Sequence, residues 1–236
     1  MARVSHHHPG IRGAAVPVVG SPPRGFLPIA AVAFASALVL IATLIALGFS
    51  NHGNPARYFG EGRPGTTATV IAFAAAAVAS WLVRGDLKPD RFARFWAMAA
   101  AGFLYLARDD EFKIHENLDI AIHALLGLDA QAGISDRLDD AILASYPVFA
   151  ALVALPFRRE LLRLRWCVLM LGLAFCGFGM MLVFESLPYD NALQKRALGA
   201  AEESSKLLGA VAMLMAIFAA RMHLEQRAGE HVNRDR

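Results

Sequence analysis

Long uncharged runs dominate the pattern of hydrophobic and polar positions along the chain. The first run, Phe26–Phe49, carries no charge over 24 residues, and a helix needs about 20 apolar residues to cross the ~30 Å hydrocarbon core. It is also longer than the roughly 7–15 residues of a signal-peptide core, so we expect a retained transmembrane helix. Five further apolar segments follow: Thr66–Val83, Phe95–Ala107, Ala141–Phe157, Trp166–Phe184 and Leu207–Ala220. The pattern predicts an all-α, polytopic membrane bundle of six transmembrane helices.

Two of these segments are too short to cross a membrane unaided. Phe95–Ala107 has 13 residues and Leu207–Ala220 has 14, both below the minimum of about 17. These two helices must therefore draw neighbouring polar residues into the membrane boundary. Small residues predict close contacts between helices, and we expect them at Ala72–Ala79, at Ala97–Gly102 and at the set of Gly172, Cys176 and Gly179.

The distribution of charge predicts the orientation of the bundle. The N-terminal tail and every second connection carry 15 of the 23 basic residues but 6 of the 20 acidic ones. Because cytoplasmic loops are enriched in Lys and Arg, we expect both termini in the cytoplasm. The predicted organisation is a disordered cytoplasmic tail over 1–25, a membrane domain over 26–222 and a cytoplasmic tail over 223–236. The basic residues are spread over many short loops, which argues against a nucleic-acid partner.

Three helices bring acidic residues to one depth in the membrane. The intervals Arg94–Ile114, Arg165–Glu185 and Glu202–Arg221 each start from a cytoplasmic arginine and span 19 or 20 residues. At ~1.5 Å per residue each interval is about 30 Å long. The sequence therefore predicts a shared cluster at the outer face of the membrane.

The densest part of this cluster is the stretch from Arg108 to Asp119. If the third helix continues through it, Glu111, His115, Asp119 and His123 recur every four residues and form one stripe. Carboxylate and imidazole groups in such an arrangement suit Zn, Fe or Mn as a divalent metal. A solvated helix end is the alternative interpretation. The candidate metal ligands are Asp109, Glu111, His115, Glu116 and Glu185.

A second motif is Glu202-Glu203-Ser204-Ser205-Lys206. Glu202 and Lys206 are four residues apart in the order that favours an ion pair on a helix, and such a pair leaves Glu203 unexplained. The motif resembles the E-E-x-x-K signature of PrsW-type intramembrane proteases, in which the paired glutamates are held to be catalytic. That resemblance implies that Glu202 and Glu203 are catalytic.

The pattern D-D-x-F-x-x-H-E, followed by E-E-x-x-K, also resembles uncharacterised bacterial multipass membrane proteins. It begins at Asp109 and includes Glu116, and it implies a bacterial inner-membrane location without implying an activity.

The leading functional hypothesis is a metal-dependent membrane enzyme, a hydrolase or an oxidase, acting on a lipidic substrate. In it a metal-bound water loses its proton to a spare carboxylate, with Glu116, Glu202 and Glu203 as candidate catalytic groups. The alternatives are a proton- or cation-coupled transporter, a PrsW-like protease and a non-catalytic assembly subunit. The near absence of polar residues at mid-depth counts against the transporter.

Overall fold

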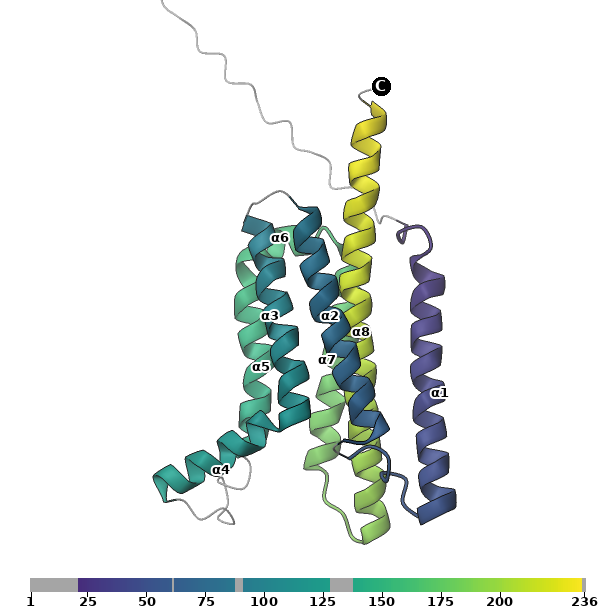
Figure 1. The fold of residues 1–236 in the computed structure, drawn as a ribbon, viewed down its shortest axis with the longest axis vertical. Helices are drawn as coiled ribbons and strands as arrows, with labels where there is room; N and C mark the ends of the chain where they lie inside the picture. Colours follow the sequence, from purple (N-terminus) through teal and green to yellow (C-terminus); the bar gives the residue numbers. More distant parts are fainter. Residues whose placement is uncertain (1–20, 61, 88–90, 128–137, 235–236) are drawn as a thin grey trace, which may run out of the picture.

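The computed structural model describes residues 21–60, 62–87, 91–127 and 138–234. Within these ranges all regular structure is helical (Figure 1), and the all-α prediction is confirmed. The elements are α1 Phe26–His52, α2 Pro64–Asp86, α3 Arg91–Phe112, α4 Ile114–Leu126, α5 Leu138–Ala154, η2 Leu155–Phe157, α6 Arg158–Leu161, α7 Arg165–Ser186 and α8 Ala192–Arg234. Most of the predicted N-terminal tail, residues 1–20, lies outside the described ranges.

Each of the six apolar segments coincides with one of the longer helices. Five helices within the described ranges have the length and the composition to cross a membrane: Phe26–His52, Pro64–Asp86, Ala141–Leu161, Arg165–Ser186 and Ala192–Gln226. Helix α3 is not one of them, because charged residues such as Arg94 and Asp110 lie close to its two ends. The chain is thus an apolar helical bundle with the features of a multi-pass membrane protein.

Helix α8 is much longer than the sequence predicts. It has 43 residues, whereas the apolar run Leu207–Ala220 has 14. Glu202 and Glu203 therefore do not begin the helix; they lie about 15 Å beyond its first residue at ~1.5 Å per residue. At the other end, α8 continues to Arg234, through most of the predicted C-terminal tail.

Helix α8 is the central packing element, in contact with α7, α2 and α1. A methyl group on Gly177 of α7 would come within 2.9 Å of the Gly209 backbone of α8, so this crossing depends on two glycines. The prediction of contacts at Gly172 and Gly179 is wrong, because a Cβ at either position would meet no atom within 4 Å. Along α2, four alanines between Ala72 and Ala79 are buried as expected.

The largest apolar cluster joins the ends of the helices at one end of the bundle. It includes Phe26, Val83, Trp96, Phe157 and Met215, from α1, α2, α3, η2 and α8. This is the end at which α6 links α5 to α7 (Figure 1). The polar side chains described below gather at the opposite end, where α3 ends and α4 begins.

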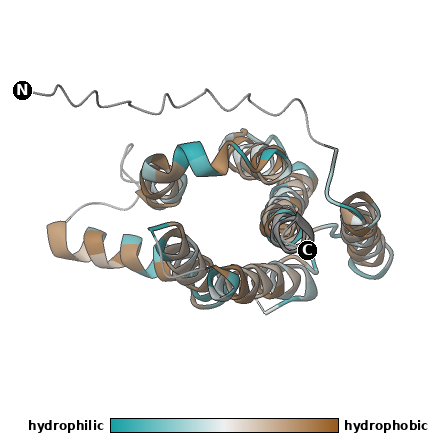
Figure 2. Cartoon of the chain, turned by 90° about the horizontal axis from the view of Figure 1, so that it is seen from above, coloured by the Kyte–Doolittle hydropathy of each residue, from teal (hydrophilic) through white to brown (hydrophobic). Residues whose placement is uncertain are grey.

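A sharp turn separates α3 from α4. Lys113 has a φ of 52°, a left-handed conformation that is uncommon for a residue other than glycine. Beyond it, α4 runs sideways out of the bundle (Figures 1 and 2). The continuous third helix is therefore a wrong prediction, and Glu111 does not share one helical stripe with His115. Asp119 and His123 form their own pair farther along α4, at 2.9 Å.

Candidate functional site

A cavity of about 400 Å³ lies at the α4 end of the bundle. Helices α3 and α4 contribute Asp109, Asp110, His115 and Glu116 to its lining, and α7 and α8 contribute Glu185, Glu202 and Glu203. Six of the seven side chains singled out from the sequence thus surround one space. Glu111 does not line it, because the side chain of this last-turn residue of α3 is exposed.

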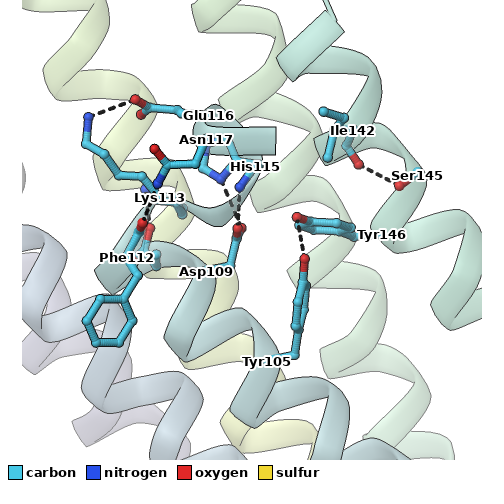
Figure 3. A network of polar contacts seen from close by, with 12 residues as sticks. Tyr105, Asp109, Phe112, Lys113, His115, Glu116, Asn117, Ile142, Ser145 and Tyr146 are labelled. Carbon is cyan, nitrogen blue, oxygen red and sulfur yellow. Dashed lines mark hydrogen bonds and ion pairs between the residues drawn. The ribbon is translucent and has the colours of Figure 1, made fainter. Parts of the chain in front are cut away.

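Asp109 holds His115 through two contacts (Figure 3). Its Oδ1 accepts a hydrogen bond from the backbone N–H of His115 at 2.8 Å, and its Oδ2 lies 3.0 Å from the ring Nδ1. Because a carboxylate accepts hydrogen bonds, Nδ1 carries the proton and Nε2 is left for the cavity. Asp109 is buried, so both contacts are shielded from water. The first also satisfies a donor at the start of α4, as a helix cap does.

The hydrogen bond that the His115 ring donates to Asp109 raises the pKa of His115 above its ordinary value of 6.5. Partial burial of the ring opposes the rise, and the charges of Asp109 and Glu116 add to it, while the charge of Lys206 lowers the pKa. Imidazole is the side chain that most often accepts and releases a proton in catalysis.

Lys206 binds two carboxylates from two helices. Its Nζ lies 2.7 Å from Asp110 Oδ1 on α3 and 3.0 Å from Glu203 Oε1 on α8. The side chains are 18% exposed for Lys206, 10% for Asp110 and 20% for Glu203. Within the Glu-Glu-x-x-Lys motif Lys206 therefore pairs with Glu203, and it adds Asp110 of α3, which the sequence pattern did not predict. An ammonium has three N–H donors, and these bonds occupy two of them.

Each of the two carboxylates keeps one buried oxygen without a hydrogen-bond partner. These atoms are Asp110 Oδ2 and Glu203 Oε2, and both residues line the cavity. A buried polar atom that lacks a partner costs about 1–3 kcal/mol, so such atoms in a native site call for a ligand or water. Asp110 was not among the candidates chosen from the sequence, although its place beside Asp109 in an acidic stretch was a usable signal.

Two tyrosines extend the polar network toward α5. The hydroxyl groups of Tyr105 on α3 and Tyr146 on α5 are 3.1 Å apart (Figure 3), and Tyr146 also lines the cavity. Sequence reasoning missed both residues. The available signal was a hydroxyl group inside the otherwise apolar segment that contains Tyr146, since polar groups at membrane depth are often functional.

The residues predicted to bind a metal do not form a cluster of metal ligands among the described residues. Among the described residues, no three His, Cys, Asp or Glu side chains are grouped in a way that could hold a metal ion. The position between Asp110 and Glu203, where two carboxylates converge, is taken by the Lys206 ammonium. The chain supplies its own cation at that point.

Comparison with known proteins gives a family. No curated protein and no solved structure matches the chain significantly. Residues 26–220 match the family described as a domain of unknown function, DUF8692, and this range contains every helix from α1 to α7 and most of α8. It also contains every residue that lines the cavity. The chain belongs to the DUF8692 family.

Proposed function

We propose that this protein is a membrane-embedded hydrolase that acts on a lipidic substrate at the outer face of the membrane. The observation that carries the proposal is the Asp109–His115 pair, which faces a cavity shared with Lys206. A histidine oriented by a buried carboxylate is a recurring general base in hydrolases. The cavity volume of about 400 Å³ falls within the range of roughly 300–1,000 Å³ found for small-molecule sites.

In the proposed reaction His115 Nε2 takes a proton from a water molecule, and the water oxygen attacks the carbonyl carbon of an ester. The bond from that carbon to the alcohol oxygen then breaks, the alcohol oxygen receives the proton from His115, and an acid and an alcohol leave. The third N–H of Lys206 is the proposed group for stabilising the negative oxygen of the intermediate. The hydrogen bond from His115 Nδ1 to Asp109 Oδ2 keeps the imidazole in the required tautomer.

A substrate of mixed character matches the two halves of the cavity. Its outer end has the carboxylates and the lysines, and its walls farther along the bundle include Phe73, Leu106 and Leu182. A water-soluble substrate would gain little from these apolar walls, whereas a lipidic one would bury its chain against them.

The test is isotopic. The purified full chain in nanodiscs of phosphatidylethanolamine and phosphatidylglycerol is incubated in ¹⁸O water, and released fatty acid is analysed by mass spectrometry. We expect ¹⁸O in the product of the wild type and of the control Glu111→Gln, which changes an exposed carboxylate outside the cavity. His115→Gln should lower the rate by about 10²–10⁴-fold, the usual range for a general base. Equal rates in His115→Gln and wild type, or no ¹⁸O release by the wild type, would refute the proposal.

A divalent metal is the second candidate in the same site. The observation that favours it is the pair of unpartnered oxygens, Asp110 Oδ2 and Glu203 Oε2, since oxygen ligands suit hard divalent cations. Metal analysis of detergent-purified protein tests this form of the proposal. Stoichiometric Zn, Fe or Mn that is lost in Glu203→Gln and retained in Glu111→Gln would support it, and metal-free protein with full hydrolytic activity would refute it.

We also propose six membrane crossings, with both termini in the cytoplasm of a bacterial inner membrane. Helix α3 is closely packed on α2, and its 22 residues extend about 33 Å at ~1.5 Å per residue. In a background with Cys167→Ala and Cys176→Ala, single cysteines at Asn54 and Asn191 are labelled with a membrane-impermeant maleimide. With six crossings both lie outside and react, while Gly85→Cys is protected. With five, Asn191→Cys lies on the opposite side from Asn54→Cys.

A further inference from the structure

The cavity has an excess of negative charge. Its lining contains six carboxylates and two ammonium groups. One ammonium, that of Lys113, is bound to Glu116 at 2.8 Å, and the other, Lys206, is shared by Asp110 and Glu203. A ligand that enters this space gains most if its polar end is positive.

The unpartnered oxygens point to a donor of hydrogen bonds. The side chain of Asp110 is nine-tenths buried, its Oδ2 has no partner, and it lines the cavity. Glu203 Oε2 on α8 is also buried without a partner, although the whole side chain is 20% exposed. Both carboxylates already bind Lys206, so a divalent cation between these oxygens would place two charges beside an ammonium. A primary ammonium places one charge there and brings three N–H donors.

The side of the cavity between α5 and α7 is open. Helix α5 reaches α7 through η2 and α6, and the two long helices make few direct contacts of their own. Ala150 of α5 and Gly179 of α7 both line the cavity and are exposed, and so is Phe175, at 47%. In a membrane this apolar side faces lipid, so a lipid can enter without leaving the bilayer.

We propose that the cavity binds a lipid with a primary-ammonium headgroup, which enters between α5 and α7 and places its ammonium at Asp110 Oδ2 and Glu203 Oε2. This inference rests on the proposed function and names its substrate class. The acyl chain lies along the apolar walls and leaves through the opening beside Phe175. The acyl ester that joins the chain to the glycerol then lies on the side of the cavity that holds His115.

Native mass spectrometry of the purified full chain tests the binding without requiring turnover. The probes are dioleoyl phosphatidylethanolamine, dioleoyl phosphatidylglycerol and dioleoyl phosphatidylcholine, which share their chains and phosphate. We expect phosphatidylethanolamine to be retained at least tenfold more strongly than phosphatidylglycerol, with phosphatidylcholine between them because it has charge but no N–H. Equal or stronger retention of phosphatidylglycerol would overturn the proposal.

Two carboxylate variants and one control locate the ammonium. Asp110→Asn and Glu203→Gln should each reduce the preference for phosphatidylethanolamine to about threefold or less, and Glu111→Gln should keep it. An unchanged preference in both variants would overturn the assignment. Free ethanolamine that displaces the lipid at equal concentration would show a soluble-amine site instead, and displacement by millimolar Mg²⁺ would show a divalent-cation site; either result overturns the lipid proposal.

A pair of glycines on α7 tests the entrance even if the carboxylate variants do not fold. A side chain at Gly179 or at Gly172 meets open space, but of the two Gly179 alone lines the cavity. Gly179→Leu should lower retention of phosphatidylethanolamine at least fivefold, and Gly172→Leu should leave it unchanged; equal retention in the two variants would contradict lateral entry. His115→Gln should keep lipid binding and lose hydrolysis, so binding and reaction fail separately.

Discussion

Replacement of Lys206 by methionine is the perturbation whose cost follows most directly from the structure. The ammonium is the shared partner of Asp110 at 2.7 Å and Glu203 at 3.0 Å. Methionine keeps the length of the side chain and removes the charge, so it leaves two buried carboxylates facing each other. Removal of one partner from a buried ion pair costs about 3–5 kcal/mol.

The cost of removing Lys206 should lie in the lower part of this range, because water reaches part of the cluster of Lys206, Asp110 and Glu203. Lys206 is 18% exposed and Glu203 is 20% exposed, so some of the lost interaction is replaced by solvation. We expect Lys206→Met to lower the free energy of unfolding by about 3 kcal/mol. Lys206→Arg keeps the charge and should cost about 1–2 kcal/mol, since a guanidinium cannot occupy the same position unchanged.

The assay is equilibrium unfolding in mixed micelles with increasing sodium dodecyl sulfate, followed by the fluorescence of the three tryptophans. A triple variant, Lys206→Met with Asp110→Leu and Glu203→Met, removes the charges together and should recover to within about 1 kcal/mol of the wild type. A loss below about 1 kcal/mol in the single variant would show that the three groups are solvated in the membrane. A triple variant as unstable as the single one would show that packing, not charge, is responsible.

Three further predictions concern single contacts. In Asp109→Asn the pKa of His115 should fall back to 6.5 or lower, measured by NMR of the imidazole. Because the wild-type pKa of His115 is raised, the Asp109–His115 pair stabilises the fold fully below pH 6.5 and less as the pH rises through the shifted pKa. The variant should lose this pH dependence of stability. An unchanged titration of His115 in the variant would contradict the prediction. Gly177→Ala should lower the free energy of unfolding by about 1–3 kcal/mol because the added Cβ meets the backbone of Gly209. Gly172→Ala places its Cβ in open space and should stabilise the helix by about 0.5–1 kcal/mol. Equal thermal stability of the two variants would contradict the close crossing of α7 and α8. Thr66→Val should cost about 1–3 kcal/mol because the buried hydroxyl donates to the Phe59 carbonyl at 2.8 Å, and an unchanged midpoint of thermal unfolding would show that the hydroxyl is dispensable.

The fold could be predicted from the sequence where hydrophobic length decides it. The run Phe26–Phe49 and helix α1 differ by three residues at one end, because an uncharged segment of that length has few alternatives. The beginning of α8 could not be predicted in this way, since residues 192–206 are polar enough to be taken for a connection. Their alanines favour a helix, and α8 begins at Ala192.

The depth of the site could be predicted, but its pairings could not. Counting residues from the arginines at the opposite helix ends correctly brings Glu185 and Glu203 to the level of His115, where all three line one cavity, because the rise of a helix is constant. The rotation of one helix against another is set by packing, for example at Gly177 and Gly209, and rotation decides which carboxylate meets Lys206. The left-handed turn at Lys113 has no glycine or proline to announce it, so the continuous stripe through Glu111 was the natural but wrong expectation.

Two adjacent aspartates on α3 connect the His115 contact with the Lys206 contact. Asp109 and Asp110 are one residue apart on α3, so their side chains point about 100° apart around the helix axis. Asp109 holds His115 and the start of α4, and Asp110 holds Lys206 of α8. The proposed base and the proposed electrophile are therefore positioned by one rigid turn of α3, and neither can shift without breaking a buried, charged hydrogen bond. Any movement of α3 along α8 would change the distance between His115 and Lys206, which makes the packing of α3 itself a determinant of the chemistry.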